Sequence, residues 1–270
     1  MSETGVHRLT YTGFYDSESR PVRGVVPVEA AISLVVNGQT LVNLMCSPSH
    51  LEDLAIGFLF NEGLIESLDD VAVVELCADG RSIDIWLEHD IDVPRVRSIT
   101  SGCSGGTTFG AQGDRAPRVE SSLVIAPDLV TTLMGKLSKE ATLYRRAGGV
   151  HVAALALLDQ ENPLVCVAED IGRHNTLDKM AGACLREGRS VEDGVVLTSG
   201  RVSSEMVVKV ARMGAPVVVS RTSPTSLSVE LAEASGITLI GYTRRRSFRV
   251  YTGAERLAVE PEQGRARARE

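Results

Sequence analysis

The sequence predicts an α/β protein, in which a C-terminal domain with a parallel sheet follows a smaller, β-rich α+β domain. Beyond residue 119, short apolar segments alternate with segments of helical period, which is typical of parallel strands joined by right-handed helical crossovers. Before residue 98, strand-like segments are separated by turn signals, and one segment has helical spacing. The Gly-, Ser- and Thr-rich stretch 98–118 lies between them and is predicted to be a long loop.

The smaller domain is predicted over residues 21–97, after a loose segment at 1–20. Its strands should form two hairpins, because Asn37-Gly38 and Asp79-Gly80 are strong turn signals. The four strands are expected at residues 25–36, 40–45, 71–77 and 82–87.

One helix is predicted between the two hairpins. Apolar residues recur there at helical spacing, beginning at Leu51 and continuing to Leu59. Pro48 suits the first turn with Ser47 as the cap, and Gly63 suits a left-handed stop just past the end.

The larger domain is predicted over residues 119–257, before a loose tail at 258–270. Its strands are expected at 150–158, 164–169, 194–198, 216–220 and 237–241. Its helices are expected at 128–146, from about Asn175 onward, at 203–213 and at 225–235.

Composition and charge exclude several classes of protein. The chain of 270 residues is 43% hydrophobic and 23% charged, which is ordinary for a globular protein. No apolar stretch has the length of a membrane span, and the polar start lacks a signal-peptide pattern, so we expect a cytoplasmic protein with no membrane partner. A net charge of −7 argues against nucleic-acid binding.

The ends of the last three strands carry hydroxyl groups and arginines. Because ligands bind at the carboxyl ends of strands in open α/β sheets, and because arginine grips phosphate with paired hydrogen bonds, these ends predict a cradle for a phosphorylated ligand. Helix caps and a solvated rim are the alternative reading of any one corner. The residues are Ser199, Gly200 and Arg201, then Ser220, Arg221 and Thr222, then Tyr242, Thr243 and Arg244.

The segment 168–175 joins a predicted strand to a predicted helix, so its charged residues also lie at a strand's carboxyl end. Its sequence is Ala-Glu-Asp-Ile-Gly-Arg-His-Asn, which includes Asp170, Arg173 and His174. His174 is a candidate acid–base group that Asp170 could orient. A structural hydrogen-bonding role at the helix start is the alternative.

Cys103 is the candidate nucleophile. It lies among glycines in the 98–118 stretch, where consecutive backbone amides can stabilise a thiolate or a persulfide. The five cysteines are odd in number and never spaced as C-x-x-C, so neither a disulfide framework nor a four-cysteine zinc site is expected. Cys166 and Cys184 read as core residues, whereas Cys46 and Cys77 are ambiguous.

A zinc-dependent hydrolytic site is excluded by its missing motifs. Zinc deaminases need H-x-E together with P-C-x-x-C, but His151 is followed by Val-Ala and the chain has no C-x-x-C. We therefore expect no protein-bound zinc.

Taken together, these segments resemble the formate dehydrogenase accessory sulfurtransferase family, known as FdhD. The resemblance covers roughly residues 20–257. It rests on Leu51–Leu59 with Glu62-Gly63, the Cys103 loop, the 168–175 segment, Thr198-Ser199-Gly200-Arg201 and residues 220–225.

The resemblance implies a cytidine-deaminase-like three-layer fold without zinc, usually as a homodimer. It also implies a sulfurtransferase that takes sulfur from a cysteine desulfurase as a Cys103 persulfide. The sulfur would pass to the molybdenum cofactor, in its bis-molybdopterin guanine dinucleotide form, before insertion into the formate dehydrogenase catalytic subunit. GDP and GTP would be partial mimics of this substrate. The family's cofactor-binding stretch falls on Tyr242, Thr243, Arg244, Arg245, Arg246 and Ser247.

One departure from the family pattern concerns the second cysteine of its C-x-x-C, which is Gly106 here. A mechanism that needs a disulfide within this motif is therefore excluded, although a persulfide on one cysteine needs no partner. The target could also be another molybdenum or tungsten enzyme. A non-catalytic cofactor-binding chaperone and a thiol redox sensor remain as alternative functions.

Overall fold

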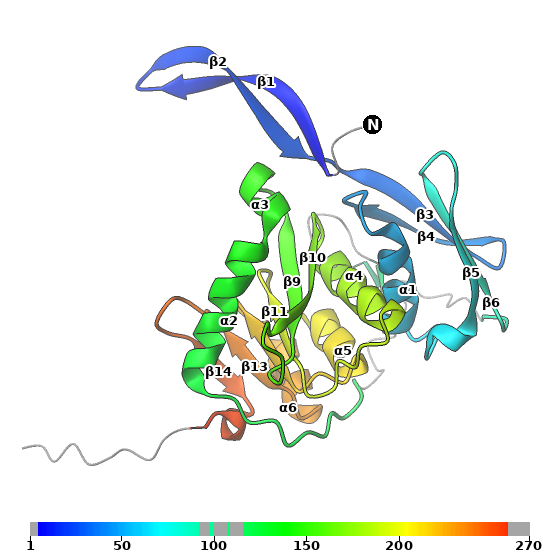
Figure 1. The fold of residues 1–270 in the computed structure, drawn as a ribbon, viewed down its shortest axis with the longest axis vertical. Helices are drawn as coiled ribbons and strands as arrows, with labels where there is room; N and C mark the ends of the chain where they lie inside the picture. Colours follow the sequence, from blue (N-terminus) through cyan, green and yellow to red (C-terminus); the bar gives the residue numbers. More distant parts are fainter. Residues whose placement is uncertain (1–4, 92–97, 100–106, 109–115, 259–270) are drawn as a thin grey trace, which may run out of the picture.

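The computed structural model describes residues 5–91, 98–99, 107–108 and 116–258 (Figure 1). The larger domain is built on a six-stranded sheet in the order β10-β9-β11-β12-β13-β14. Its strands are β9 (His151–Ala156), β10 (Leu164–Asp170), β11 (Val195–Thr198), β12 (Val217–Ser220), β13 (Thr238–Gly241) and β14 (Arg249–Thr252).

The strands β11, β12 and β13 are parallel, as predicted, whereas β9, β10 and β14 run antiparallel to their neighbours. The prediction of a parallel sheet is thus right for the centre and wrong for the edges. The connections at 157–163 and 242–248 are too short for parallel crossovers, which need a dozen or more residues.

Helices cover both faces of this sheet and make three layers (Figure 1). Alternate strand residues face opposite layers: Val196 and Val218 pack towards α4 and α5, and Leu197 and Val219 pack towards α2. This double burial explains why the central strands read as continuous apolar runs. The mixed α/β class is confirmed, and the likeness to cytidine deaminases stays a prediction. The helices are α2 (Pro127–Glu140), α3 (Thr142–Ala147), α4 (Arg173–Arg186), α5 (Ser204–Arg212) and α6 (Ser226–Ala234).

The smaller domain is a four-stranded sheet in the order β4-β3-β6-β5, with both predicted hairpins present. Helix α1 (Leu51–Asn61) packs its apolar residues against one face of this sheet. The strands are β3 (Ala30–Val36), β4 (Gln39–Cys46), β5 (Val71–Leu76) and β6 (Ser82–Leu87).

Helices α1 and α4 join the two domains at a backbone-to-backbone contact. A Cβ atom added at Gly57 would lie 1.8 Å from the carbonyl oxygen of Asp178, and one added at Gly182 would lie 1.9 Å from that of Asp53. Only glycine fits at such a crossing. A buried ion pair extends the junction to α5, because Lys209 Nζ lies 2.7 Å from Asp178 Oδ1.

The N-terminal segment differs from the prediction. Residues 1–20 were expected to be loose, but β1 (Val6–Tyr15) and β2 (Glu18–Pro27) form a hairpin that projects from the body (Figure 1). Its turn consists of Asp16 and Ser17, both with positive φ, and contains no glycine that would mark it in the sequence. Consequently the expected strand at 25–36 is two strands in different sheets.

Two helix predictions also need correction. Helix α1 begins at Leu51 with His50 as its N-cap, and the Ser47 hydroxyl accepts a hydrogen bond from the Ile171 amide instead of capping the helix. The helix expected at 128–146 is broken at Ala141 into α2 and α3. Of the predicted tail, Ala258 is hydrogen-bonded to Ile125, and residues 259–270 lie outside the described part of the chain.

Candidate functional site

The three predicted strand ends lie side by side at one edge of the sheet, where hydrogen bonds connect them. The Ser220 hydroxyl donates to the Gly200 carbonyl at 2.7 Å. The Thr243 amide donates to the Ser220 carbonyl at 3.1 Å, and the Tyr242 amide donates to the Thr222 carbonyl at 2.9 Å. The structure therefore brings together the corners that sequence reasoning assigned to one ligand.

The predicted cofactor-binding residues at these strand ends fall into buried, half-buried and exposed groups. Gly200, Ser220 and Thr243 are buried, and the hydrogen bonds above connect them within the turns. Ser199, Thr222 and Tyr242 are half-buried. The exposed group forms a basic rim that suits an anion: Arg201, Arg221, Arg244, Arg245 and Arg246, with Ser247.

Two of the rim arginines are held in place by hydrogen bonds. The Arg244 guanidinium donates to the backbone carbonyls of Arg221 and Thr243. Arg221 Nη1 donates to the Ser138 hydroxyl on α2 at 2.9 Å. A guanidinium group has five N–H donors, so each of these side chains has the chemistry to form paired hydrogen bonds with phosphate oxygens as well.

Asp170 is fully buried and acts within the fold. Its carboxylate lies 2.6 Å from Lys179 Nζ and accepts hydrogen bonds from the backbone amides of Ser47 and Gly172 and from the side chain of Asn175. Its acceptor positions are thereby filled, and within the described residues none of them goes to His174. The expectation that Asp170 orients His174 or contacts the cofactor does not fit this arrangement. Asp170 instead fixes the turn between β10 and α4.

His174 and Arg173 are also buried, at the first turn of α4. His174 Nε2 lies 3.3 Å from the Ser203 hydroxyl. Burial, with the nearby charges of Arg173 and Lys209, lowers the pKa of His174 to about 3. At neutral pH the ring is therefore uncharged, which favours the structural role over that of a general acid. Arg173 packs against Gly200, where an added Cβ would lie 2.9 Å from Arg173 Cβ.

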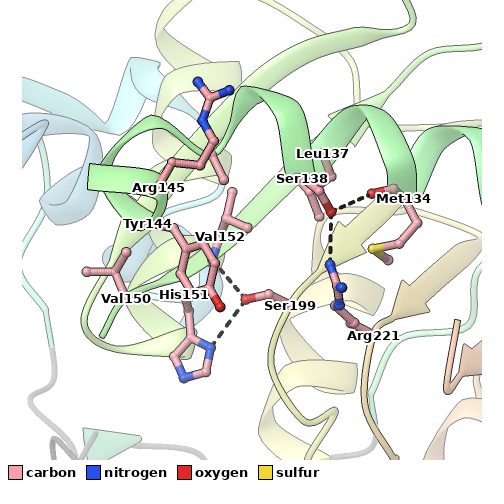
Figure 2. Close-up of a pocket in the computed structure, with 11 residues that line it drawn as sticks. Met134, Leu137, Ser138, Tyr144, Arg145, Val150, His151, Val152, Ser199 and Arg221 are labelled. Carbon is pink, nitrogen blue, oxygen red and sulfur yellow. Dashed lines mark hydrogen bonds between the residues drawn. The ribbon is translucent and has the colours of Figure 1, made fainter. Parts of the chain in front are cut away.

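A pocket of about 360 Å³ adjoins the strand ends, between α2–α3 and the start of β9 (Figure 2). We call it the α3 pocket. Its apolar lining consists of Met134, Leu137, Ala141, Val150 and Val152. Its polar and aromatic lining consists of Ser138, Tyr144, Arg145, His151, Ser199 and Arg221.

His151 is one of several residues of this pocket that sequence reasoning missed as site residues. It begins β9, which is antiparallel to β11, so it lies at the same sheet edge as Ser199. Its Nδ1 atom is 3.3 Å from the Ser199 hydroxyl (Figure 2). Burial and the charge of Arg173 lower the pKa of His151. Predicting His151 as a site residue would have required knowing that β9 runs antiparallel to β11, and the sequence pattern did not reveal this.

Glu169 positions α3 over the pocket. Its carboxylate accepts hydrogen bonds from the backbone amides of Leu143 and Tyr144, each at 2.8 Å, and from the Thr142 hydroxyl at 3.0 Å. These amides belong to the first turn of α3, where a continuous helix would bond them to the preceding turn. The contact therefore explains the break at Ala141.

Cys103 lies outside the described residues, so its predicted role stays a prediction. The strands on either side of its segment, β7 (Ser98–Ile99) and β8 (Thr107–Thr108), pair antiparallel with each other. Among the described cysteines, burial raises the pKa of Cys46 to about 12. A side-chain hydrogen bond with Cys184, together with burial, raises the pKa of Cys166. Neither thiol is therefore suited to ionise near neutral pH.

The model of the FdhD/NarQ family matches residues 27–258. This chain belongs to the FdhD/NarQ family. The resemblance seen in the sequence is thus confirmed. No helix in the described ranges combines the length and apolar character that crossing a membrane requires.

Relatives in this family carry names that describe sulfur transfer. The sulfur carrier protein FdhD of Bacillus subtilis (strain 168) is 36% identical over 250 residues, which cover 90% of this chain and 94% of the relative. That of Geobacillus kaustophilus (strain HTA426) is 35% identical over 247 residues, which cover 87% and 90%.

A solved structure supports the fold. The crystal structure of a protein described as a formate dehydrogenase accessory protein, from Desulfotalea psychrophila, superposes with a TM-score of 0.75. The two sequences are 25% identical, and the match covers 94% of this chain and 99% of the other.

Proposed function

We propose that this chain is a sulfurtransferase that carries sulfur as a persulfide on Cys103 and delivers it to the molybdenum cofactor. The observation that carries the proposal is its membership of a family whose relatives, similar along nearly the whole chain, are named sulfur carriers. The basic rim supports it, because an acidic protein of net charge −7 gathers arginines at one sheet edge, as a phosphate-bearing substrate would require.

The reaction divides into two steps. In the first, the Cys103 thiolate attacks the outer sulfur of a persulfide on a cysteine desulfurase, a new sulfur–sulfur bond forms, and the desulfurase cysteine leaves as a thiolate. In the second, two electrons from a thiol reductant cleave that bond, so that sulfide passes to the metal and Cys103 returns to its thiolate. No second cysteine is needed, which is compatible with Gly106.

The rim would hold the substrate during the second step. Arg201, Arg221 and Arg244 to Arg246 would bind the phosphates of the bis-molybdopterin guanine dinucleotide, and GDP or GTP would mimic part of it. Ser199 and Thr222 would add hydroxyl groups. The loaded cofactor would then enter the formate dehydrogenase catalytic subunit. The homodimer and the cytoplasmic location stay predictions.

Genetic complementation tests this proposal. A strain that lacks the gene would receive the wild-type chain, Cys103→Ala or, as the matched control, Cys77→Ala, which alters a half-buried cysteine of the smaller domain. We expect formate dehydrogenase activity to return with the wild type and the control, and to stay at background with Cys103→Ala. Full activity with Cys103→Ala would contradict the persulfide mechanism and favour a non-catalytic chaperone.

A further inference from the structure

We propose that the projecting hairpin β1–β2 is a docking arm, which binds the enzyme subunit that receives the loaded cofactor through one apolar face. The inference rests on the proposed function, because that function gives the protein a cofactor to hand over. It goes further by assigning an interaction surface to a segment that neither the strand ends nor Cys103 explains.

The two faces of this hairpin differ in composition. Side chains alternate between the faces along each strand, and residues opposite each other in the register share a face. One face, which we call the tyrosine face, carries the large apolar residues Leu9, Tyr11, Tyr15, Val22 and Val26. The opposite face is mainly polar between an apolar root and Phe14 near the tip.

The root of the hairpin is packed against the body, whereas the tyrosine face is exposed. Val6 and Val25, on the mainly polar face, belong to a small apolar cluster with Leu143 of α3 and with Val150. On the tyrosine face, by contrast, Tyr11 is 48% exposed, Tyr15 is 47% exposed and Val26 is 41% exposed. An apolar strip of this kind on a projecting arm indicates a surface that a partner covers.

The side chains of the tyrosine face are held in place before any partner arrives. The Tyr11 ring lies against Gly24, where an added Cβ would be 2.6 Å from its Cε1 atom. The Tyr15 ring lies against Gly13 in the same way, and the Arg20 guanidinium stacks 4.4 Å from the centre of that ring. Tyrosine and arginine dominate the binding energy of many interfaces, and fixed side chains lose less entropy on binding.

The size of the tyrosine face fits a transient partner better than a permanent second copy of this chain. Strands of ten residues make a ribbon about 34 Å long and roughly 10 Å wide, so one face offers about 340 Å². A stable interface ordinarily buries about 800 Å² on each partner. A protein that binds for one delivery and then leaves needs less area.

The position of the root favours the cofactor acceptor as this partner. Pro27, at the end of β2, lies against Gly149, where an added Cβ would be 3.3 Å from Pro27 Cγ. Two residues later, His151 begins β9 and contacts Ser199 at the sheet edge that carries the basic rim. The arm therefore projects from beside the rim (Figure 1). The acceptor must approach the rim to receive the cofactor, whereas the sulfur donor acts in a step that needs no cofactor.

Surface plasmon resonance of the full-length protein on immobilised, cofactor-free catalytic subunit of formate dehydrogenase tests the docking. The variants are Tyr11→Thr and Val26→Thr on the tyrosine face. Phe14→Thr is the matched control, because it removes a 75% exposed aromatic ring from the same hairpin but from the opposite face. Threonine is a good strand former, and hydrogen exchange of the hairpin amides would verify that the strands stay paired. Val26→Thr provides the test if Tyr11→Thr loses this protection.

We expect Tyr11→Thr to weaken binding about tenfold or more, as loss of a central tyrosine does at other interfaces. Val26→Thr should weaken it about threefold or more through lost apolar burial. Phe14→Thr should stay within about twofold of wild type. If Phe14→Thr weakens binding as much as Tyr11→Thr, if no variant changes it, or if the wild-type protein does not bind the subunit, the assignment is overturned.

Two further measurements identify other occupants of the tyrosine face. Light scattering should give the same molecular mass for Tyr11→Thr and wild type, and a fall in mass would show that a second copy covers this face. Persulfide formation on Cys103 by a cysteine desulfurase should proceed at the same rate in both, and slower formation would show that the sulfur donor docks there instead. Either result would overturn the assignment. A lack of persulfide on wild-type Cys103 would contradict the sulfur-carrier proposal separately, since that step does not involve the acceptor.

Discussion

Replacing Gly57 by alanine should destabilise the protein strongly, because the α1–α4 crossing leaves no room for a side chain. The added Cβ would lie 1.8 Å from the Asp178 carbonyl oxygen and 2.6 Å from the Gly182 amide nitrogen. Both obstructing atoms belong to backbone and cannot rotate away. To restore an ordinary contact the helices would have to separate by roughly 1.5 Å, which also weakens the dispersion contacts on either side.

The magnitude follows from overpacking. One extra methyl group in a tight core ordinarily costs about 1–3 kcal/mol, and the immobile backbone here places the expected loss near 3 kcal/mol or above. For a chain of this size that corresponds to a fall of roughly 6–12 °C in the unfolding temperature. Because the same junction supports the turn that holds Asp170, GDP binding should weaken as well.

Thermal and urea unfolding followed by circular dichroism would measure this effect. Gly135→Ala is the matched control, because Gly135 lies within α2 and a Cβ there meets nothing within 4 Å. Alanine should stabilise that helix by up to about 1 kcal/mol. Equal unfolding temperatures for the two variants would refute the close-contact reasoning.

Three other predictions concern the site. Arg221→Ala should weaken GDP binding about tenfold or more, because a charge-assisted hydrogen bond contributes roughly 1.5–3 kcal/mol; Arg23→Ala, on the projecting hairpin, should not change it in calorimetric titration. The ring of His174 should stay neutral between pH 5 and 8 by NMR, because its folded-state pKa is about 3. An unfolded histidine takes up a proton near pH 6.5, so its contribution to stability is complete above that pH and declines as the pH falls towards 3. Gly106→Cys should fold but release more sulfide, with equal or lower formate dehydrogenase activity, because a nearby thiol can attack the persulfide and close a disulfide.

Each of these three predictions would be contradicted by a specific result. Unchanged GDP titrations for Arg221→Ala would place the nucleotide elsewhere. A His174 ring that titrates near pH 6 would contradict its burial beside Arg173 and Lys209. A rise in formate dehydrogenase activity with Gly106→Cys, with labelled sulfur on the introduced cysteine, would show that a second thiol relays sulfur productively.

The strand ends could be predicted from sequence because the physics behind them is local. An apolar run that exits into hydroxyls and an arginine marks a strand end, and the carboxyl ends of parallel strands meet at one edge. The sequence alone therefore predicts that Arg201, Arg221 and Arg244 belong to one site. The hairpin turn at Asn37-Gly38 was predictable for the same reason, since type I′ turns favour that pair.

The missed features depend on partners distant in sequence. The spacing of apolar residues at 128–146 fits a single helix. The break at Ala141 is explained only by Glu169 in β10, which accepts a hydrogen bond from the Leu143 amide. Gly57 and Gly182 look like ordinary helix-weakening residues until their helices cross. His151 becomes a pocket residue because β9 runs antiparallel to β11, which alternation of apolar segments does not specify.

Mass spectrometry of the protein after incubation with a cysteine desulfurase and cysteine tests the sulfur-carrier proposal most directly. The account predicts a gain of one sulfur, about 32 Da, on the peptide that contains Cys103, removable by a thiol reductant. Cys103→Ala should show no gain. Sulfur found only on Cys46 or Cys77, or full labelling of the Cys103→Ala variant, would contradict the account.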